Sequence, residues 1–231
     1  MAPERASGRR LGFCGIFTAS SFFCSQTKST ALQILKIALY RSRVKNLILV
    51  KHSLPEIIPT IPAKEWVLSK PGQVRCEVLA KRLESYSPDI VASSAEPKAV
   101  ETAQIIARQI NKPFHIVEGL HEHDRTGVEF LGKEQFEARV IDFFMRPDKL
   151  VMGRETANQA CERFSKALAS VELEHPDKNI VVVSHGTVIT LFVEKFTGLE
   201  TFSFWRKLDL PSFVVLSLPQ HELVKTVESV V

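Results

Sequence analysis

Residues 46–56 read NLILVKHSLPE and place a histidine directly after a short apolar run. The unbroken aliphatic tetrad LILV is the pattern of a strand that is buried on both faces of a sheet. Lys51, His52 and Ser53 follow at once, and Pro55 then excludes a regular continuation. In open α/β sheets, ligands bind beyond the carboxyl ends of the strands. Taken alone, the stretch fits either a ligand-binding histidine or a simple polar cap on a strand end.

A second stretch has the same construction. Residues 179–183 (NIVVV) are of the buried-strand type, and they end in Ser184, His185 and Gly186. Two strands that each deliver a histidine to the same edge of a sheet predict a site with two imidazoles, which favours the ligand-binding interpretation.

The chain from residue 46 onward alternates between strand-like and helix-like segments. Apolar residues recur at helical spacing in 74–83, 95–110, 130–144, 155–173 and 188–196, and short apolar runs occupy 90–92, 113–117 and 213–218. We expect the acidic first turn and Gly153 to open the helix over 155–173. The alternation predicts an α/β fold with a mostly parallel central sheet flanked by helices. We see no repeat or internal linker, so residues 46–231 are expected to form one domain.

The positive charge of the chain is concentrated at its N-terminus. The whole chain of 231 residues has a formal net charge of +4. Residues 1–45 contribute +7, because eight basic residues stand against Glu4 alone, and this leaves −3 for the remainder. The basic pI therefore gives no case for a nucleic-acid-binding core.

Residues 1–45 are interpreted as an extension outside the domain over 46–231. The broken apolar run over 11–24 is shorter than the roughly 20 residues that cross a bilayer, so we expect no stable membrane insertion. A secretory signal lacks a clean small-x-small cleavage site here, whereas few acids and many Ser and Arg fit an organellar transit peptide. An upstream segment that does not fold is the third interpretation, and the sequence leaves all three open.

The four cysteines show no metal-binding or redox spacing. Cys14 and Cys24 lie in the extension, and Cys76 and Cys161 fall among apolar residues of helix-like segments. We interpret them as reduced, small apolar side chains, which favours a reducing compartment and a cytoplasmic location.

Six stretches carry a resemblance to a known family. They are, in order, LVKHS, WVLSKPGQVRCEVLAKRL, SSAEPKAVETA, GLHEHDRTG, GRETANQACERFSKAL and VVVSHGTVITLF. In order and spacing they resemble the histidine phosphatase superfamily, in its phosphoglycerate-mutase-like branch, over about residues 46–218. The resemblance implies the three-layer sandwich of that branch. Two positions depart from the family pattern: Lys51-His52-Ser53 replaces Arg-His-Gly, and Lys98 stands where an Arg usually precedes Ala-x-x-Thr-Ala.

The resemblance implies a metal-independent phosphomonoesterase, a phosphoric monoester hydrolase of the histidine acid phosphatase kind. His52 is then the nucleophile and becomes phosphohistidine, since neutral imidazole is a good nucleophile near pH 7. The charge of the phosphoryl group needs cationic and hydrogen-bonding partners. The matching positions are His185, Lys51 and Lys98, with Ser53 and Arg125 as further substrate-binding residues. Lys lacks the two-pronged donor array of Arg, so we expect a working but looser grip on phosphate.

The leaving oxygen needs a proton donor, and the family places an acid in the loop before the long helices. Glu122 matches that position, and Asp124 is its rival. Like charge from bound phosphate would raise the pKa of a neighbouring carboxyl and let it act as the acid.

The same residues allow other interpretations. His121, His123 and Asp124 could be drawn with the two strand-end histidines as a binuclear metal site, but the other histidines are scattered without ligand spacing, so we expect no metal or other cofactor. A phosphoglycerate-mutase-type phosphotransferase and a non-catalytic phospholigand-binding protein remain the alternative functions. The expected partner is a phosphorylated small molecule or a phosphoprotein, and the oligomeric state is left open.

Overall fold

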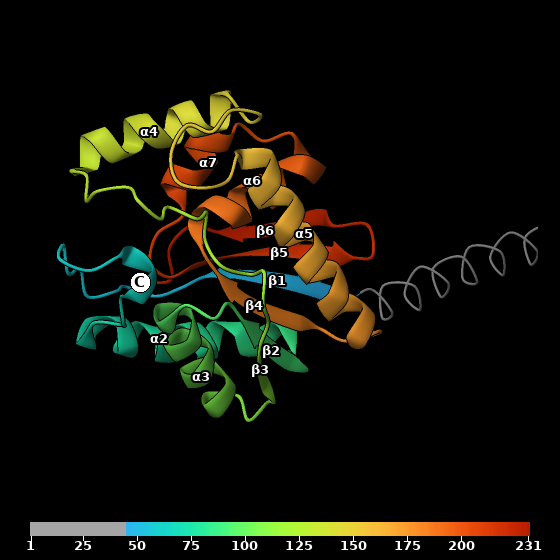
Figure 1. Cartoon of the computed structure of the whole chain (residues 1–231). Coiled ribbons are helices and arrows are strands. Elements are labelled where there is room, and N and C mark those ends of the chain that lie inside the picture. The colour runs from blue at the N-terminus through green and yellow to red at the C-terminus, as the bar shows by residue number, and fades with distance from the viewer. Residues whose placement is uncertain (1–44) are drawn as a thin grey trace, which may run out of the picture. The chain divides into compact units, whose positions relative to one another are not determined.

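The computed structural model describes residues 45–231, and the interpretations of the N-terminal extension lie outside this part of the chain. A single six-stranded sheet runs in the order β3-β2-β4-β1-β5-β6 (Figure 1). Its strands are β1 (Lys45–Lys51), β2 (Ile90–Ser93), β3 (Phe114–Ile116), β4 (Ile180–Ser184), β5 (Ser212–Leu218) and β6 (Glu222–Val227).

The sheet is parallel on one side and antiparallel on the other. Strands β3, β2, β4 and β1 run parallel, whereas β5 and β6 are added antiparallel at the β1 side. The central pair is β1 and β4, in a register that sets Lys51 opposite Ser184. The residues that follow these two positions therefore leave the sheet side by side. The predicted α/β class with a mostly parallel sheet is confirmed.

Helices cover both faces of the sheet. They are α2 (Lys70–Leu83), α3 (Pro97–Gln109), α4 (Lys133–Met145), α5 (Ala157–Glu174), α6 (Gly186–Thr197) and α7 (Thr201–Lys207), with short 3-10 turns at η1 (Ala63–Glu65) and η2 (Glu84–Tyr86). Alternate residues of β1 point to opposite faces: Ile48 and Val50 pack with α2 and α3, and Leu47 and Leu49 pack with α5 and α6. This is the layered arrangement that Figure 1 shows.

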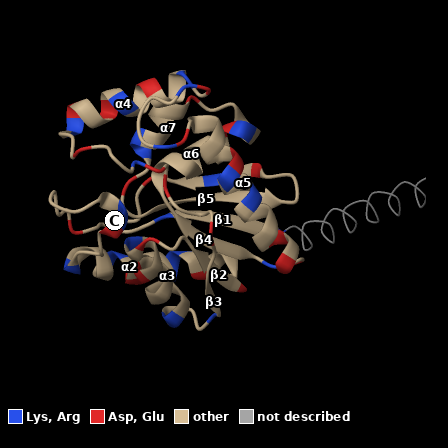
Figure 2. Cartoon of the chain, viewed as in Figure 1, with Lys and Arg blue, Asp and Glu red and all other residues tan. Residues whose placement is uncertain are grey.

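Two properties of the helices bear on surface chemistry. Helices α4 and α5 each carry both signs of charge along their length (Figure 2). None of the helices in residues 45–231 is long and apolar enough to cross a membrane.

Helix α5 begins differently from the prediction. It starts at Ala157 behind a capping box, in which the Thr156 hydroxyl accepts from the Gln159 N–H and the Gln159 side chain accepts from the Thr156 N–H. Its first turn holds no acidic residue. Glu155, which was expected to favour the positive end of the helix dipole, instead lies just before the cap and binds Arg163.

The C-terminal part of the sheet is larger than expected. The apolar run over 213–218 is the last strand that the sequence predicts, but β6 follows it as a hairpin partner of β5. Most of β6 is exposed, so it lacks the apolar run by which the other strands were recognised. Helix α7 was also missed, because seven residues are too few to show a clear helical period.

Candidate active site

The two strand-end histidines meet at the edge of the sheet. His52 follows β1, and its backbone N–H donates to the carbonyl of Ser184 at 3.0 Å. His185 follows β4, and the two imidazole rings lie 5.2 Å apart between centroids, at 62° to one another. Both side chains are buried, His52 being 7% exposed and His185 1%. The parallel register of the two strands thus builds the predicted pair of imidazoles.

The ring of His52 is held in a defined tautomer. Its Nδ1 lies 2.8 Å from the carbonyl oxygen of Ser53, which can only accept a hydrogen bond. Nδ1 therefore carries the proton, and Nε2 keeps its lone pair. Burial, followed by the charges at His185 and Lys98, lowers the pKa of His52 well below its ordinary value of 6.5. The imidazole is neutral at physiological pH, with one nitrogen free to act as a nucleophile.

His185 is buried beside Ser94 at the start of α6. Its Nε2 lies 2.9 Å from the Ser94 hydroxyl, and its Nδ1 is buried without a hydrogen-bond partner among residues 45–231. Burial, followed by the charge of Lys98, lowers the pKa of His185 well below 6.5. A buried polar atom without a partner is rare in folded proteins and is a reason to expect a ligand there.

Gly186 lets the chain close up behind His185. A Cβ at this position would lie 3.2 Å from Cε of Lys51 and 3.4 Å from Nε1 of Trp205, so a larger residue would press on both. Glycine therefore permits β4 to turn into α6 within contact of the end of β1.

Glu122 lies at the N-terminus of α6. One carboxylate oxygen accepts from the Thr187 N–H at 3.2 Å and lies 3.5 Å from the Arg125 guanidinium, and the other accepts from the His123 N–H at 2.9 Å. Burial alone would raise the pKa of Glu122, but Arg125, then His185 and the His123 N–H, lower it to about 2. With these protein neighbours the carboxyl is ionised, and any rise in its pKa has to come with bound phosphate.

Asp124, the rival acid, is occupied elsewhere. Its carboxylate accepts from the backbone N–H of Thr126 at 2.9 Å and stabilises the turn that it begins. Hydrogen bonding from Thr126 lowers the pKa of Asp124 despite partial burial. The geometry favours Glu122 over Asp124 as the proton donor, and this assignment stays a prediction.

The two predicted lysine cations are bound by internal partners. Lys98 Nζ donates to the carbonyl of Ala63 at 2.7 Å and to the carboxylate of Glu96 at 2.5 Å. Lys51 Nζ donates to the carbonyl of Leu208 at 2.5 Å, and burial lowers the pKa of Lys51 to about 8 against weaker opposing effects of Glu122 and Asp209. Both ammonium groups lie close enough to His52 to lower its pKa.

Arg125 is better placed to meet an anion. Its guanidinium donates to the Thr187 hydroxyl at 2.9 Å and packs 4.7 Å above the ring centroid of Phe136. Its Nε is buried without a partner in the described part of the chain. A donor is thus left for a ligand beside Glu122.

The hydroxyl of Ser53 points away from the imidazoles. It donates to the carbonyl of Gly72 at 2.7 Å, while the Ser53 backbone N–H donates to the hydroxyl of Thr102 at 3.0 Å. These two bonds attach the end of β1 to α2 and α3. These hydrogen bonds give Ser53 a positioning role. Direct contact between its side chain and the substrate stays a prediction.

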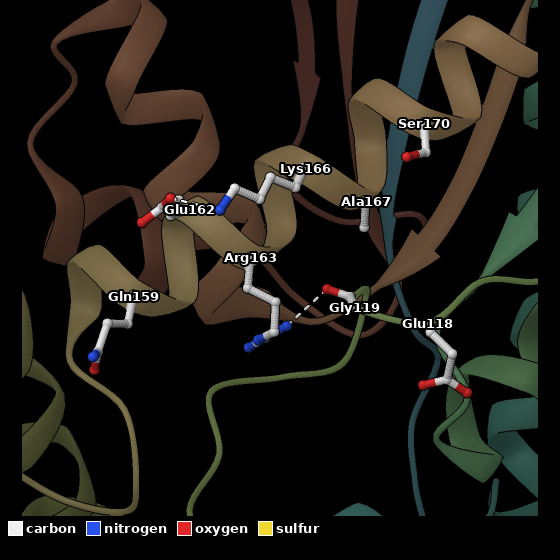
Figure 3. Close-up of a pocket in the computed structure, with 8 residues that line it drawn as sticks. All are labelled: Glu118, Gly119, Gln159, Glu162, Arg163, Lys166, Ala167 and Ser170. Atoms are coloured by element: carbon white, nitrogen blue, oxygen red, sulfur yellow. Dashed lines mark hydrogen bonds and ion pairs between the residues drawn. The ribbon is translucent and has the colours of Figure 1, made fainter.

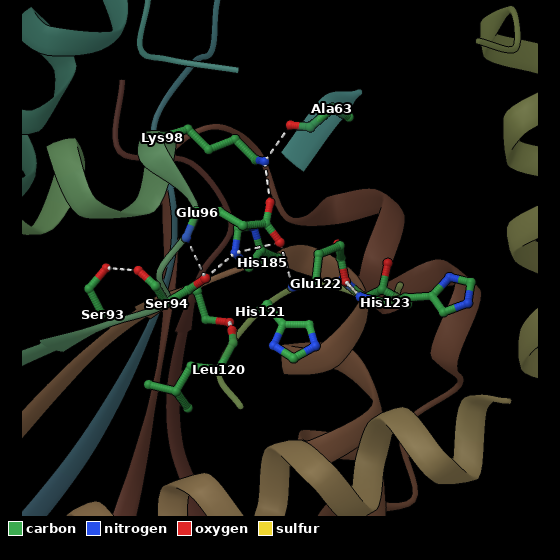
Figure 4. Close-up of polar contacts among 12 residues, drawn as sticks. Ala63, Ser93, Ser94, Glu96, Lys98, Leu120, His121, Glu122, His123 and His185 are labelled. Carbon is green, nitrogen blue, oxygen red and sulfur yellow. Dashed lines mark hydrogen bonds and ion pairs between the residues drawn. The ribbon is translucent and has the colours of Figure 1, made fainter. Parts of the chain in front are cut away.

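Glu96 belongs to the site but was not singled out from the sequence. One carboxylate oxygen binds Lys98, and the other accepts from the Glu122 N–H at 2.8 Å and lies 3.5 Å from Nε2 of His185. Figure 4 shows these contacts together, with Glu96 between Lys98 and Glu122. One signal was present: Glu96 follows β2 closely, at the same edge where β1 and β4 deliver the two histidines.

Arg163 is a second residue that the sequence did not reveal. It lies on α5 and donates to the carbonyls of Gly119, His121 and Glu122 at 2.7, 2.9 and 3.2 Å. It also binds the Glu155 carboxylate at 2.5 Å. The guanidinium reaches the loop from the wall of an open pocket of about 540 Å³ against α5 (Figure 3). Arg163 therefore holds the backbone that carries Glu122.

His123, in the same loop, is held by packing and by a backbone carbonyl. His123 packs on Phe143 with ring centroids 4.1 Å apart, and its Nε2 lies 3.2 Å from the carbonyl of Glu155. Within residues 45–231, no group of three or more His, Cys, Asp or Glu side chains is arranged to hold a metal ion.

Comparison with known proteins identifies the relatives of the chain. A family model described as the histidine phosphatase superfamily (branch 1) matches residues 61–227. A protein of Bacillus subtilis (strain 168), described as the uncharacterized phosphatase PhoE, is 24% identical over 131 residues. The match covers 57% of this chain and 65% of the relative, so the chain aligns with just under two thirds of that protein.

Solved structures with the same fold have low sequence identity. Bacillus stearothermophilus YhfR matches with a TM-score of 0.65 and 20% identity, over 80% of this chain and 96% of that one. A phosphoserine phosphatase from Entamoeba histolytica matches with a TM-score of 0.63 and 19% identity, over 80% and 98%. A mycobacterial glucosyl-3-phosphoglycerate phosphatase matches with a TM-score of 0.61 and 18% identity, over 76% and 91%. At this identity the likeness establishes the fold.

Proposed function

The chain belongs to branch 1 of the histidine phosphatase superfamily, and on that premise we propose that it is a metal-independent phosphomonoesterase with His52 as its nucleophile. The observation that carries the proposal is the hydrogen bond from Nδ1 of His52 to the Ser53 carbonyl. It fixes the proton on one nitrogen and leaves the lone pair of the other free to attack phosphorus. The coarser conclusion, a phosphatase, follows from the family and its phosphatase relatives.

In the first half-reaction, Nε2 of His52 attacks the phosphorus atom and the bond to the ester oxygen breaks. The phosphoryl group moves to His52, and the alcohol leaves with a proton. His185, whose Nδ1 has no partner among the described residues, and Arg125, whose Nε likewise has none, would donate to the phosphoryl oxygens. Lys98 and Lys51 would add positive charge close to the reacting nitrogen.

Glu122 would supply the proton to the leaving oxygen. Because its pKa is about 2 before phosphate binds, the Glu122 carboxyl is ionised when the substrate arrives. A phosphate ester has a second pKa near 6, so a bound monoanion can bring the proton with it. The negative charge of the phosphate then raises the pKa of Glu122, and the proton can pass through this carboxyl to the alcohol.

In the second half-reaction, water attacks the phosphohistidine. Glu122, now ionised again, accepts a proton from that water, the bond between phosphorus and Nε2 breaks, and inorganic phosphate is formed. Arg163 holds the backbone of the Glu122 loop through both steps, acting on the carbonyls and away from the substrate.

We propose a phosphorylated small molecule as the substrate. Two neighbours in fold are described as phosphatases of phosphoserine and of glucosyl-3-phosphoglycerate, both small phosphate monoesters. A phosphoprotein is the other substrate class consistent with this chemistry.

The test uses the purified full chain with p-nitrophenyl phosphate and a panel of phosphorylated metabolites and phosphopeptides, in the presence of excess EDTA. Release of inorganic phosphate that EDTA leaves unchanged is the expected result. Activity that EDTA abolishes and zinc or manganese restores would contradict the proposal. Phosphate transfer to an acceptor without net release would indicate the phosphotransferase, and binding without any turnover would indicate a phospholigand-binding protein.

A further inference from the structure

Glu96 occupies Lys98, one of the cations that the proposed mechanism assigns to phosphate, and lies beside the His185 ring. Its two oxygens together contact the Lys98 ammonium at 2.5 Å, the Glu122 N–H at 2.8 Å and, at 3.5 Å, the His185 imidazole. The carboxylate side chain is only 10% exposed. An acidic group therefore lies inside the site with its charge directed at the cationic side of the phosphate-binding region (Figure 4).

The Glu96 carboxylate does not cap the helix that it precedes. Glu96 is the N-cap residue of α3, a position at which a polar side chain can accept from the first free N–H groups of the helix, as Glu200 does at α7. Here the Glu96 side chain makes no such capping hydrogen bond. It is directed into the site instead, which means that this contact is preferred over the helix end.

A purely structural role toward Lys98 does not account for the arrangement. Lys98 Nζ already donates to the carbonyl of Ala63 at 2.7 Å, and the lysine side chain is buried. This one carbonyl leaves the buried positive charge uncompensated, so the Glu96 oxygen on Lys98 also serves as its counter-charge. The second carboxylate oxygen makes contacts that do nothing for Lys98, since they run to Glu122 and His185.

A carboxylate and a phosphate compete for the same partners. Both are anions that accept short, charge-assisted hydrogen bonds from ammonium and N–H donors. In a buried site the repulsion between two such anions is weakly screened. Phosphate can use the full charge of Lys98 only when the carboxylate has left it.

We infer that Glu96 is a built-in competitor of phosphate: it occupies Lys98 and the region beside His185 when the site is empty, and it lowers the affinity for phosphate. This inference rests on the proposed function, because that function places phosphate at these groups. It assigns Glu96 a positioning role that sets affinity for substrate and product, with the chemistry left to His52 and Glu122. A lower affinity for inorganic phosphate favours its release after the second half-reaction.

The experiment is a calorimetric titration of the full chain with inorganic phosphate, which requires no turnover. Glu96→Gln keeps the shape of the side chain and removes its charge, and Glu96→Asp keeps the charge but shortens the reach to Lys98. Glu77→Gln, on the exposed side of α2, is the matched control. We expect Glu96→Gln to bind phosphate about tenfold tighter or more, Glu96→Asp to lie between it and the parent, and Glu77→Gln to match the parent.

The outcomes separate the inference from the proposed function. Unchanged or weaker phosphate binding in Glu96→Gln would overturn the inference, and if that variant does not fold, parental or weaker binding in Glu96→Asp would do so. Tighter binding in a protein that hydrolyses nothing would support the competitor and contradict the phosphatase. Where turnover is present, the inhibition constant of inorganic phosphate should fall by the same factor as the dissociation constant.

Discussion

The two histidines and the two lysines of the site are held in opposite ways. His52 and His185 emerge from the central pair of strands, and each keeps a ring nitrogen that the described residues leave for chemistry. Lys51 and Lys98 are bound by carbonyls and, for Lys98, by a carboxylate. The imidazoles are thus positioned for reaction before phosphate binds. The lysine charges are shared with internal partners, and phosphate has to compete with those partners for them. Rate and affinity should accordingly depend on different residues.

The largest effect is expected from His52→Ala. Removing the nucleophile should lower hydrolysis of p-nitrophenyl phosphate by roughly a thousandfold or more, because no other group can form the covalent intermediate. Binding of inorganic phosphate should survive, since the lysines and Arg125 remain. Parallel kinetics and calorimetric titration check this, and turnover close to that of the parent would show that the imidazoles are not where the chemistry occurs.

Glu122→Gln should come next, with kcat reduced by about a hundredfold to a thousandfold through loss of proton transfer.

Arg125→Met tests the same proton transfer through its pH dependence. Arg125 is the leading opposing charge that lowers the pKa of Glu122 to about 2, so its removal should raise that pKa. Protonated Glu122 cannot serve as the base toward water, and the acidic limb of the kcat profile should therefore move to higher pH. If the acidic limb stays at the same pH in Arg125→Met, a group other than Glu122 is responsible for it.

Lys98→Met should act on affinity and rate together, by about tenfold to a hundredfold in kcat/KM. The same oxygens are held by Lys98 in the ground state and in the transition state, so the dissociation constant of phosphate should rise in parallel. Lys98→Arg should tighten phosphate binding if bidentate contacts are restored. Loss of rate with no loss of affinity in Lys98→Met would place this lysine with the histidines and break the comparison.

Lys51 should show its main effect in stability. Burial lowers its pKa in the folded protein to about 8 from 10.5, so the folded state loses the proton first as pH rises. The unfolded state binds more protons between these values, and stability therefore increases with pH there. Relative to Lys51→Met, the parent should gain up to about 3 kcal/mol between pH 8 and 10.5. Denaturant unfolding at several pH values measures this, and a constant difference would show that Lys51 is not desolvated.

The sequence predicted most of this fold because four of its strands, β1, β2, β4 and β5, are buried along most of their length. The runs at the ends of which His52 and His185 stand were visible as apolar segments, and the mostly parallel direction of the strands followed from their alternation with helices. Strand β6 was not visible, because its residues are mostly exposed and carry no apolar run. A buried strand can thus be recognised from its own apolar residues. An exposed strand such as β6 forms by pairing with its neighbour and leaves no such pattern in the sequence.

The site was predicted less completely than the fold, for a physical reason. His52, His185 and Glu122 were found from motif order, and the structure brings them into one site. Glu96 and Arg163 were missed, because their roles depend on where a side chain turns: Glu96 leaves its helix end for Lys98, and Arg163 reaches from α5 to a distant loop. Neither direction can be inferred from spacing along the chain.

The most direct measurement of the central claim is covalent trapping. The full chain is mixed with excess p-nitrophenyl phosphate, quenched in strong base within the first turnovers, and analysed by mass spectrometry of the peptide that carries residues 46–56. We predict one phosphate on His52 that is stable in base and lost in acid, absent from His52→Ala and unaffected by EDTA. Rapid hydrolysis with no phosphate on His52, or the same phosphorylated peptide pattern in His52→Ala, would contradict the account.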